Sequence, residues 1–384
     1  MGHIMITPGA IFIETVTAEA VESALGRWTG RGTGGVLAFV PENTDSPATI
    51  ATLQAACRKQ ALPLGGAMFP SLVAHGRLVN HGAVLLFGGD APPPLLIEAP
   101  GGPRGADLMV EQAADRVEPQ LSEDAANLLF CVFDGLDPLI ADHLDRLYLR
   151  LADLVDYIGV NAGSERFVPT PCLFDAERLQ QGGMLLQALP NHRGGFLRHG
   201  FPTPDRLITV TSATGNRVVQ IEWKPALDVY RQLILDQYGV TLDRDNFYSL
   251  AVNFPFGILR ADGEVLVRIP VALDETGAIY CVGEIPSSSV LTLLDARTKN
   301  QDAVQELAEK LRPLSGPDQA MLFFYCAGRR LQRGDDAPAE LLKLAPLAPG
   351  GAFGALTLGE IGSTQGSGYP LFHNACIVGL PWPK

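Results

Sequence analysis

Three stretches of the chain repeat one order of hydrophobic and polar positions. Each opens with a continuous apolar run of strand length, at 35–41, 127–135 and 320–328. Each run is followed by a segment with the apolar spacing of a helix, and then by a Gly-rich apolar segment with a tight turn. Another apolar run closes each stretch, at 81–89, 182–189 and 373–380. This order predicts one α/β building block that is present three times.

Any large α/β protein offers some alternation of this kind. The Gly-rich segment that returns after each helix, at 64–74, 157–164 and 350–362, favours duplication of one strand-helix-strand unit. We therefore expect an α/β fold, of the mixed α+β kind, in which mixed β-sheets are flanked by helices.

The region between the second and third stretches has a different pattern. Residues 207–294 are rich in short apolar and β-branched runs, and turn signals separate them at Thr214-Gly215-Asn216 and Ala261-Asp262-Gly263. They predict antiparallel strands. The helix-strand alternation gives way near 190–200, so we predict two lobes, residues 1–195 and 196–384.

Charge, apolar run length and cysteine spacing exclude several kinds of partner and cofactor. The formal net charge is −13, which opposes binding to phosphate backbones, so no nucleic acid is expected. The start lacks the pattern of a secretory signal, and no apolar run approaches the roughly 20 residues of a membrane span. We therefore expect a cytoplasmic protein with no membrane partner. Its six cysteines contain no C-x-x-C pair, which disfavours structural zinc and covalently attached haem.

An ordered series of short motifs in the second half resembles a known family. The series begins at His199-Gly200, continues through the strand and hairpin at 208–216, and reaches Lys224-Pro225-Ala226 before Tyr230. Further members, in order, are Phe254-Pro255-Phe256-Gly257, Arg268-Ile269-Pro270, Gly283-Glu284-Ile285-Pro286, Cys326-Ala327-Gly328-Arg329, Gly359-Glu360-Ile361-Gly362 and His373-Asn374. The series resembles the FIST-C domain. The first half is similar to FIST-N, although the family's G-E-I turn is absent there, and Ala375 departs from the usual polar residue.

The resemblance implies tandem FIST-N and FIST-C lobes and a role as a ligand sensor. The variant turns at 65–70 and 157–164 resemble the NosP-like branch. That branch comprises haem-binding nitric oxide sensors that control a partner histidine kinase or cyclic-di-GMP enzyme. Haem, with nitric oxide bound to it, is the cofactor that this resemblance implies.

Noncovalent haem needs an axial ligand, most often histidine, and an apolar pocket. His199 lies in a Gly-bounded loop next to Phe201, and we predict it as the iron ligand. The alternative is a loop histidine that hydrogen-bonds the backbone. His373 is the second candidate for cofactor binding, although it can equally well bridge the Gly-Glu-Ile turn. For His143, on the predicted second helix, a solvated role is expected.

Charged and polar residues among apolar neighbours suggest a second kind of site. If Arg329 and Glu360 are buried, each needs a partner of opposite charge. That partner can be an amino or carboxylate group of a ligand, or it can belong to an internal salt bridge that fixes the C-terminal hairpin. Arg268 and Glu284 raise the same question. Tyr325 and Asn374 complete the predicted ligand contacts, with a core aromatic role as the alternative for Tyr325.

Familiar catalytic motifs are absent from the sequence: there is no P-loop, no H-E-x-x-H and no G-x-S-x-G. We therefore expect a sensor and not an enzyme. The first hypothesis is a haem-based nitric oxide sensor. The second is a sensor that binds an amino acid or similar small metabolite without haem, and the third is an enzyme with a pocket nucleophile.

Overall fold

The computed structural model describes residues 4–6, 9–30, 32, 34–101, 104–202, 205–261, 263–297 and 302–383. Each of the three repeated stretches forms a pair of parallel strands. The pairs are β3 (Val36–Pro41) with β4 (Leu64–Phe69), β9 (Asn127–Asp134) with β10 (Asp156–Ala162), and β23 (Met321–Cys326) with β24 (Ala352–Thr357). The crossovers are α2 (Ser46–Lys59), α4 (Ile140–Leu151), and the short helices α8 (Ala327–Arg333) and α9 (Ala337–Leu342). The predicted strand-helix-strand unit is confirmed.

Every unit is extended in the same way at both ends. A strand and a helix precede the first parallel strand: β2 (Ala10–Ile13) and α1 (Ala18–Gly26), β8 (Leu95–Ile97) and α3 (Gly105–Val117), β14 (Phe196–Arg198) and α7 (Ala303–Leu311). A last strand returns antiparallel to that first strand: β7 (Ala83–Phe87), β13 (Met184–Pro190) and β27 (Ile377–Pro381). The short β1 (Ile4–Ile6) pairs with β2. Single 3₁₀ turns are η1 (Glu118–Gln120), η2 (Ala152–Leu154), η3 (Gly334–Asp336) and η4 (Ala345–Leu347).

The units exchange hairpins in a ring. After its second parallel strand, each unit makes a hairpin that completes the sheet of another unit. The hairpin β5 (Ser71–Ala74) and β6 (Arg77–Val79) joins β24, β11 (Leu173–Asp175) and β12 (Leu179–Gln180) join β4, and β25 (Glu360–Gly362) and β26 (Leu371–His373) join β10. Three mixed sheets result, and together with their helices we call them the three-sheet core.

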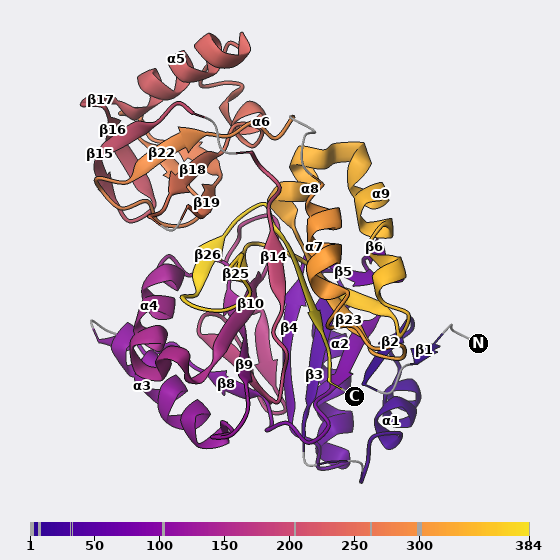
Figure 1. The fold of residues 1–384 in the computed structure, drawn as a ribbon. Coiled ribbons are helices and arrows are strands. Elements are labelled where there is room, and N and C mark those ends of the chain that lie inside the picture. Colours follow the sequence, from indigo (N-terminus) through magenta and orange to yellow (C-terminus); the bar gives the residue numbers. More distant parts are fainter. Residues whose placement is uncertain are drawn as a thin grey trace.

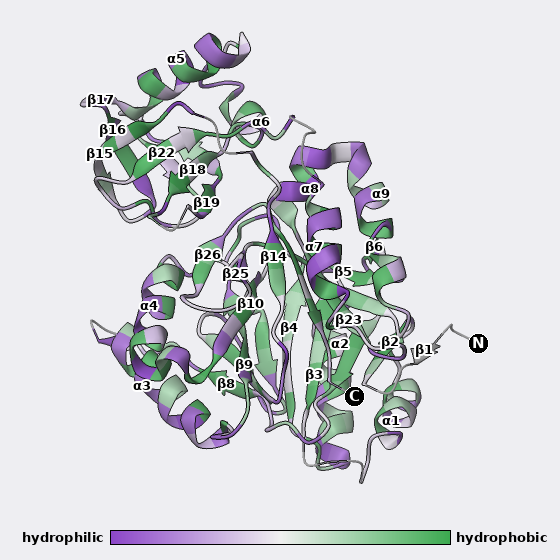
Figure 2. Cartoon of the chain, viewed as in Figure 1, coloured by the Kyte–Doolittle hydropathy of each residue, from purple (hydrophilic) through white to green (hydrophobic). Residues whose placement is uncertain are grey.

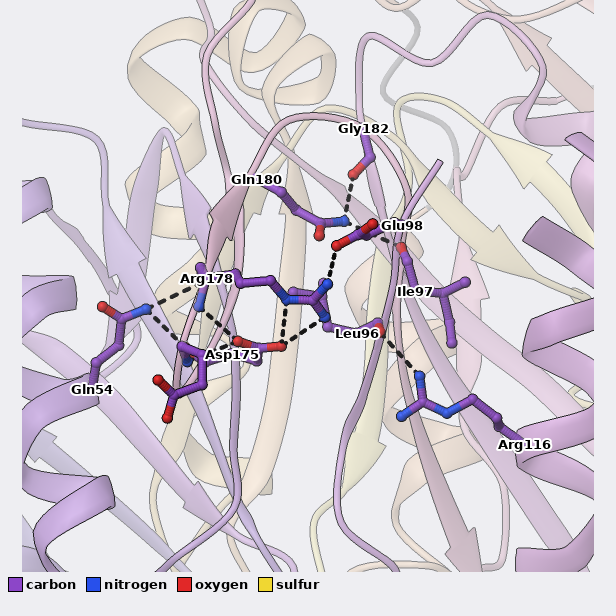
Figure 3. A network of polar contacts seen from close by, with 10 residues as sticks. Gln54, Leu96, Ile97, Glu98, Arg116, Asp175, Arg178, Gln180 and Gly182 are labelled. Atoms are coloured by element: carbon purple, nitrogen blue, oxygen red, sulfur yellow. Dashed lines mark hydrogen bonds and ion pairs between the residues drawn. The ribbon is translucent and has the colours of Figure 1, made fainter. Parts of the chain in front are cut away.

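Polar contacts fasten the exchanged hairpins in place. In the β11–β12 hairpin, Arg178 bridges Asp175 and Glu98, which follows β8 (Figure 3). Gln54 of α2 donates to the carbonyl oxygen of Asp175 at 2.8 Å. One hairpin therefore ties two units together.

The inner faces of the three sheets share one hydrophobic core. The Phe324 ring of β23 lies 5.7 Å from the Phe39 ring of β3 and 5.5 Å from the Phe130 ring of β9. Helices cover the outer faces, so the central strands are buried on both sides and need the continuous apolar runs seen in the sequence. Figure 2 shows these strands as predominantly hydrophobic and the helices as mixed.

The antiparallel region forms a separate domain inserted into the third unit, between β14 and α7. Its strands are β15 (Ile208–Thr214), β16 (Arg217–Ile221), β17 (Lys224–Pro225), β18 (Phe256–Leu259), β19 (Val265–Arg268), β20 (Pro270–Leu273), β21 (Ile279–Cys281) and β22 (Val290–Leu293), with helices α5 (Ala226–Tyr238) and α6 (Phe247–Ala251). Gly215 and Gly263 have φ angles of 57° and 83° in the predicted hairpin turns, where a positive φ favours glycine. We call residues 205–297 the inserted domain; it has its own core and lies against one end of the three-sheet core (Figure 1).

The division of the chain into two lobes, residues 1–195 and 196–384, stays a prediction. In space the sheets combine strands from both sides of that division, since β5 pairs with β24 and β10 with β25. Among the described helices, none has the length and apolar composition to cross a membrane.

Candidate functional site

The inserted domain lies over the carboxyl ends of strands β9 and β23, and three adjoining cavities lie between it and the core. Ligands of α/β proteins typically bind at such strand ends. The apolar cavity, about 110 Å³, is lined by Phe167, Ile269, Val282, Cys326, Leu358 and Asn374, among others. The middle cavity, about 170 Å³, includes Asp137, Asn216, Gly283 and Phe372. The arginine cavity, about 470 Å³, includes Asp145, Arg260, Arg268, Glu284, Ser288 and Tyr369.

Shared lining residues show that the three cavities adjoin, and we call this row of cavities the cleft. Phe167 and Val282 line both the apolar and the middle cavity, whereas Glu284 and Phe372 line both the middle and the arginine cavity. Phe167 has a φ angle of 54°, which is uncommon for a bulky residue. The cleft therefore lies at the boundary between the two domains.

His199, the predicted iron ligand, is held by its own loop. Its Nδ1 accepts a hydrogen bond from the backbone N–H of Phe201 at 2.9 Å, and the two rings stack. An imidazole that accepts at Nδ1 carries its proton on Nε2 when neutral. Burial, reinforced by the positive charges of Arg329 and Arg198, lowers the pKa of His199 to about 4. His199 is therefore neutral at pH 7, and its Nε2 is occupied by a proton.

His373 is fully buried in β26, and neither ring nitrogen has a hydrogen-bond partner within the described part of the chain. Its Nε2 lies 3.7 Å from Oε1 of Glu264, which belongs to the inserted domain. Burial, His199 and Arg268 hold the pKa of His373 well below its usual value. The two histidines are thus brought together, in their neutral forms, where the inserted domain meets the core.

The residues present do not fit haem in this arrangement. Neither His199 nor His373 is among the residues that line the three cavities. The apolar and middle cavities are smaller than the roughly 300 Å³ at which sites for drug-sized ligands begin. The arginine cavity has the volume, but histidine, cysteine and methionine are all missing from its described lining. The basic lone pair of neutral His199, on Nδ1, is already used to accept the hydrogen bond from the N–H of Phe201.

Arg329 and Tyr325 are joined to Glu340, a residue that the sequence analysis did not single out. The Arg329 guanidinium donates from Nε and Nη2 to the two carboxylate oxygens of Glu340, at 2.8 and 2.6 Å. Its Nη1 donates to the carbonyl oxygen of His199, and the Tyr325 hydroxyl donates to Glu340 at 2.5 Å. Burial alone would raise the pKa of Glu340, but Arg329 and Tyr325 outweigh it and lower that pKa. The arrangement is an internal salt bridge, with Glu340 and not Glu360 as its acid.

Glu360 lies in the protein interior, whereas Asn374 borders a cavity. Glu360 is fully buried in β25, and burial raises its pKa to about 8 although the Thr357 hydroxyl, at 2.6 Å, and the Cys376 N–H oppose the shift. Asn374 lines the apolar cavity, and its Oδ1 accepts from the N–H of Ile269 in the inserted domain at 3.4 Å. Of the six predicted site residues, Asn374 alone lines the cleft.

Arg268 and Glu284, for which the sequence left the question of pairing open, both line the arginine cavity. Burial is the main reason why the pKa of Arg268 falls to about 10. Burial also raises the pKa of Glu284, partly offset by Arg268. Arg260, beside them, was missed because nothing in its sequence context distinguishes it from a surface arginine.

The expectation of a solvated His143 was wrong. The residue is 2% exposed, and its Nε2 lies 3.0 Å from Oδ2 of Asp137. His143 comes three residues after Ile140 and four before Leu147, so it belongs to the buried stripe of α4. The contact with the Asp137 carboxylate offsets the cost of burying the polar imidazole ring.

Comparison with protein families identifies both halves of the chain. The model of the FIST N domain matches residues 35–224, and the model of the FIST C domain matches residues 226–363. No curated protein matches the chain.

Proposed function

The chain belongs to the FIST family, whose domains are small-ligand sensors in signalling, and we propose that it binds its ligand in the cleft between the inserted domain and the three-sheet core. The observation that carries this proposal is the set of three adjoining cavities at the carboxyl ends of β9 and β23. Both domains contribute walls, so a bound molecule contacts two bodies that are joined through few polar contacts.

Those contacts suggest how binding becomes a signal. Asn374 accepts from Ile269, Arg268 donates to the carbonyl oxygen of Phe372 at 2.8 Å, and the N–H of Thr364 donates to Glu264 at 2.9 Å. Each contact links the inserted domain to the core. A ligand with higher affinity for one separation of the two domains shifts their populations. A partner protein, for which we propose a histidine kinase or cyclic-di-GMP enzyme in the cytoplasm, would read that shift.

An amino acid or similar small metabolite is the ligand that the cleft supports best. The arginine cavity, about 470 Å³, combines two arginines with the carboxyl groups of Glu284 and Asp145, which suits a molecule carrying both charges. Thermal-shift screening of the full chain against single amino acids tests this. A saturating ligand should raise Tm by mass action, and failure of every amino acid would remove this ligand class.

Haem with nitric oxide is the second proposal, and one observation favours it: His373 is buried with both ring nitrogens unpaired within the described chain. Binding at His199 would require release of the Nδ1 contact with Phe201. Titration with hemin provides the test, because ligation should give a sharp Soret band that shifts with nitric oxide and is lost in His373→Ala, or in His199→Ala if that residue is the ligand. If no such band appears, haem is excluded, while the amino-acid proposal is unaffected.

A catalytic thiol has less support. Cys326 and Cys281 line the cleft, but burial raises the pKa of Cys281 to about 12 and that of Cys326 even further. The thiolate is the nucleophilic form, so neither group is activated at pH 7. The third hypothesis, an enzyme, therefore has no nucleophile prepared in this cleft among the described cysteines.

A further inference from the structure

Arg260 and Arg268 line the same cavity, and within the described part of the chain neither forms an ion pair with a carboxylate. We propose that Arg260 and Arg268 form a carboxylate-binding subsite in the arginine cavity, for a small organic acid that also carries a hydrogen-bond donor. This inference rests on the proposed function, because it names the chemical class of the ligand and the residues that hold it.

Arg268 gives the stronger support for this subsite. The residue is 3% exposed, and its Nε and Nη1 donate to the carbonyl oxygens of Glu284, Val267 and Phe372, at 2.8–3.0 Å. Carbonyl groups satisfy the N–H donors but do not neutralise the charge. Within the described ranges Arg268 forms no ion pair, and its Nη2 donates to no residue. The charge of Glu284 acts on Arg268 across the cavity but forms no ion pair with it, so a carboxylate that binds there gains a direct contact that the described protein leaves unmade.

Arg260 adds a second cation in the same cavity. Its Nε is buried without a partner, and the side chain makes no hydrogen bond or ion pair with the residues that the structure describes. The guanidinium lies over the Tyr369 ring, 5.9 Å from its centroid, just as that of Arg268 lies 5.3 Å from the Phe372 centroid. A ring beside each guanidinium restricts it from one side. The N–H groups that remain for a carboxylate are Nη2 of Arg268 and the donors of Arg260.

The other groups in the cavity select among anions. The Glu284 carboxyl has no hydrogen bond or ion pair with any described residue, and Asp145 accepts from the Tyr369 hydroxyl at 2.5 Å. Two acids beside two arginines oppose a doubly charged phosphate, since like charges repel. They favour a single carboxylate whose amino or hydroxyl group reaches Glu284. Ser288, also in this wall, has a φ angle of 68°, a strained backbone of the kind that collects at ligand sites.

The substitution Arg260→Met separates a ligand-binding arginine from a structural one. Because the Arg260 side chain bonds to nothing in the described protein, its removal should leave the Tm of the ligand-free protein unchanged or slightly higher. Arg297→Met is the matched control. Arg297 belongs to the same domain and also lies over aromatic rings, those of Tyr238 and Phe254, but it is paired with Asp295 at 2.9 Å. That control should lower Tm slightly and keep the ligand response.

The experiment measures Tm of the full chain with glycine, acetate, methylamine and inorganic phosphate, each against sodium chloride of equal ionic strength. We expect glycine and acetate to raise Tm, by about 2–4 °C for glycine near saturation, with smaller effects of phosphate and methylamine. Arg260→Met should weaken glycine binding by about tenfold or more, as loss of a charge-assisted contact does. Arg268→Met should do the same, and Arg260→Met keeps the test valid if Arg268→Met fails to fold.

Two results would overturn the subsite. One is that none of the carboxylates stabilises the unmodified protein. The other is that glycine stabilises Arg260→Met and the unmodified protein equally. If a different ligand stabilises the protein and is insensitive to both substitutions, the sensor function stands and the subsite does not. If glycine binding depends on the arginines but displaces no contact between the domains, the subsite stands and the proposed route of signalling fails.

Discussion

Arg329 and Arg268 make an instructive pair, because both are almost completely buried and both lie near the boundary between the two domains. Arg329 is held by the Glu340 carboxylate and by Tyr325. Arg268 is held by three backbone carbonyls and forms no ion pair within the described residues, although the charge of Glu284 acts on it across the cavity. The two arginines differ in whether a neighbouring helix supplies a carboxylate. Helix α9 offers a carboxylate to Arg329, whereas Arg268 faces a cavity.

The comparison shows that burial of a charge does not by itself identify a binding site. A buried arginine with its own carboxylate is a structural element, since the pair must stay together to avoid the cost of an unpaired charge. A buried arginine with only neutral acceptors is incomplete. The predictions below test whether these two environments differ in the way that their contacts indicate.

The largest effect is expected from breaking the completed pair. Glu340→Gln keeps the size of the side chain but leaves the charge of Arg329 buried and unpaired, which should cost about 3–5 kcal/mol of unfolding free energy. Urea unfolding measures it. The control Glu22→Gln removes the exposed pair with Lys59 and should change stability by less than about 1 kcal/mol. If Glu340→Gln and its control lose equal amounts of unfolding free energy, the buried pair of Arg329 and Glu340 contributes no more to stability than an exposed one.

A smaller effect is expected from Glu360, a buried acid with hydrogen-bond donors but no ion pair. Its folded pKa of about 8 lies above the ordinary value of 4.5, so between these values the folded state keeps a proton that the unfolded state has released. Stability should therefore fall as pH rises through this window, by up to about 1.4 kcal/mol per pH unit.

Glu360→Gln should flatten the pH dependence between about pH 6.5 and pH 8.5, above the range in which buried histidines titrate. Unfolding free energies measured across this range provide the test. An equal slope in the variant and the unmodified protein would show that Glu360 ionises as freely as an exposed acid.

The smallest effect is expected from Tyr325→Phe. This change removes one hydrogen bond to the Glu340 carboxylate but leaves its two contacts with Arg329, so the loss should be about 1–2 kcal/mol. Combining Tyr325→Phe with Glu340→Gln should give less than the sum of the two losses, because both act on one network. Additive losses would mean that the tyrosine contributes through packing alone.

Much of the fold followed from the sequence because the central strands are buried on both faces. Continuous apolar runs marked β3, β9 and β23, and the Gly-rich segments marked β4, β10 and β24. The exchange of hairpins did not follow, since hydrophobic patterning reports which positions are buried and not which strand lies alongside. The antiparallel strands of the inserted domain were expected, but their isolation from the three sheets was not.

The site was less predictable, because it depends on which partners meet in space. Arg329 lies in α8 and Glu340 in α9, with a 3₁₀ turn between the two helices, so their spacing gave no signal. Asn374 was found through its motif. Arg268 and Glu284 were noticed as charged residues among apolar neighbours, but only the structure reveals that one cavity contains both.

The ring of exchanged hairpins has a consequence for synthesis of the protein. Strand β5 emerges from the ribosome early, yet its partner β24 lies some 280 residues later, with Ser71 opposite Leu356. At about 5–20 residues per second, β5 waits roughly 15–60 s before its partner exists. During that interval an apolar strand edge is open to pairing with other nascent chains, which is the situation that molecular chaperones relieve. The closure that makes the core rigid when finished thus makes the growing chain dependent on protection until its last strands are made.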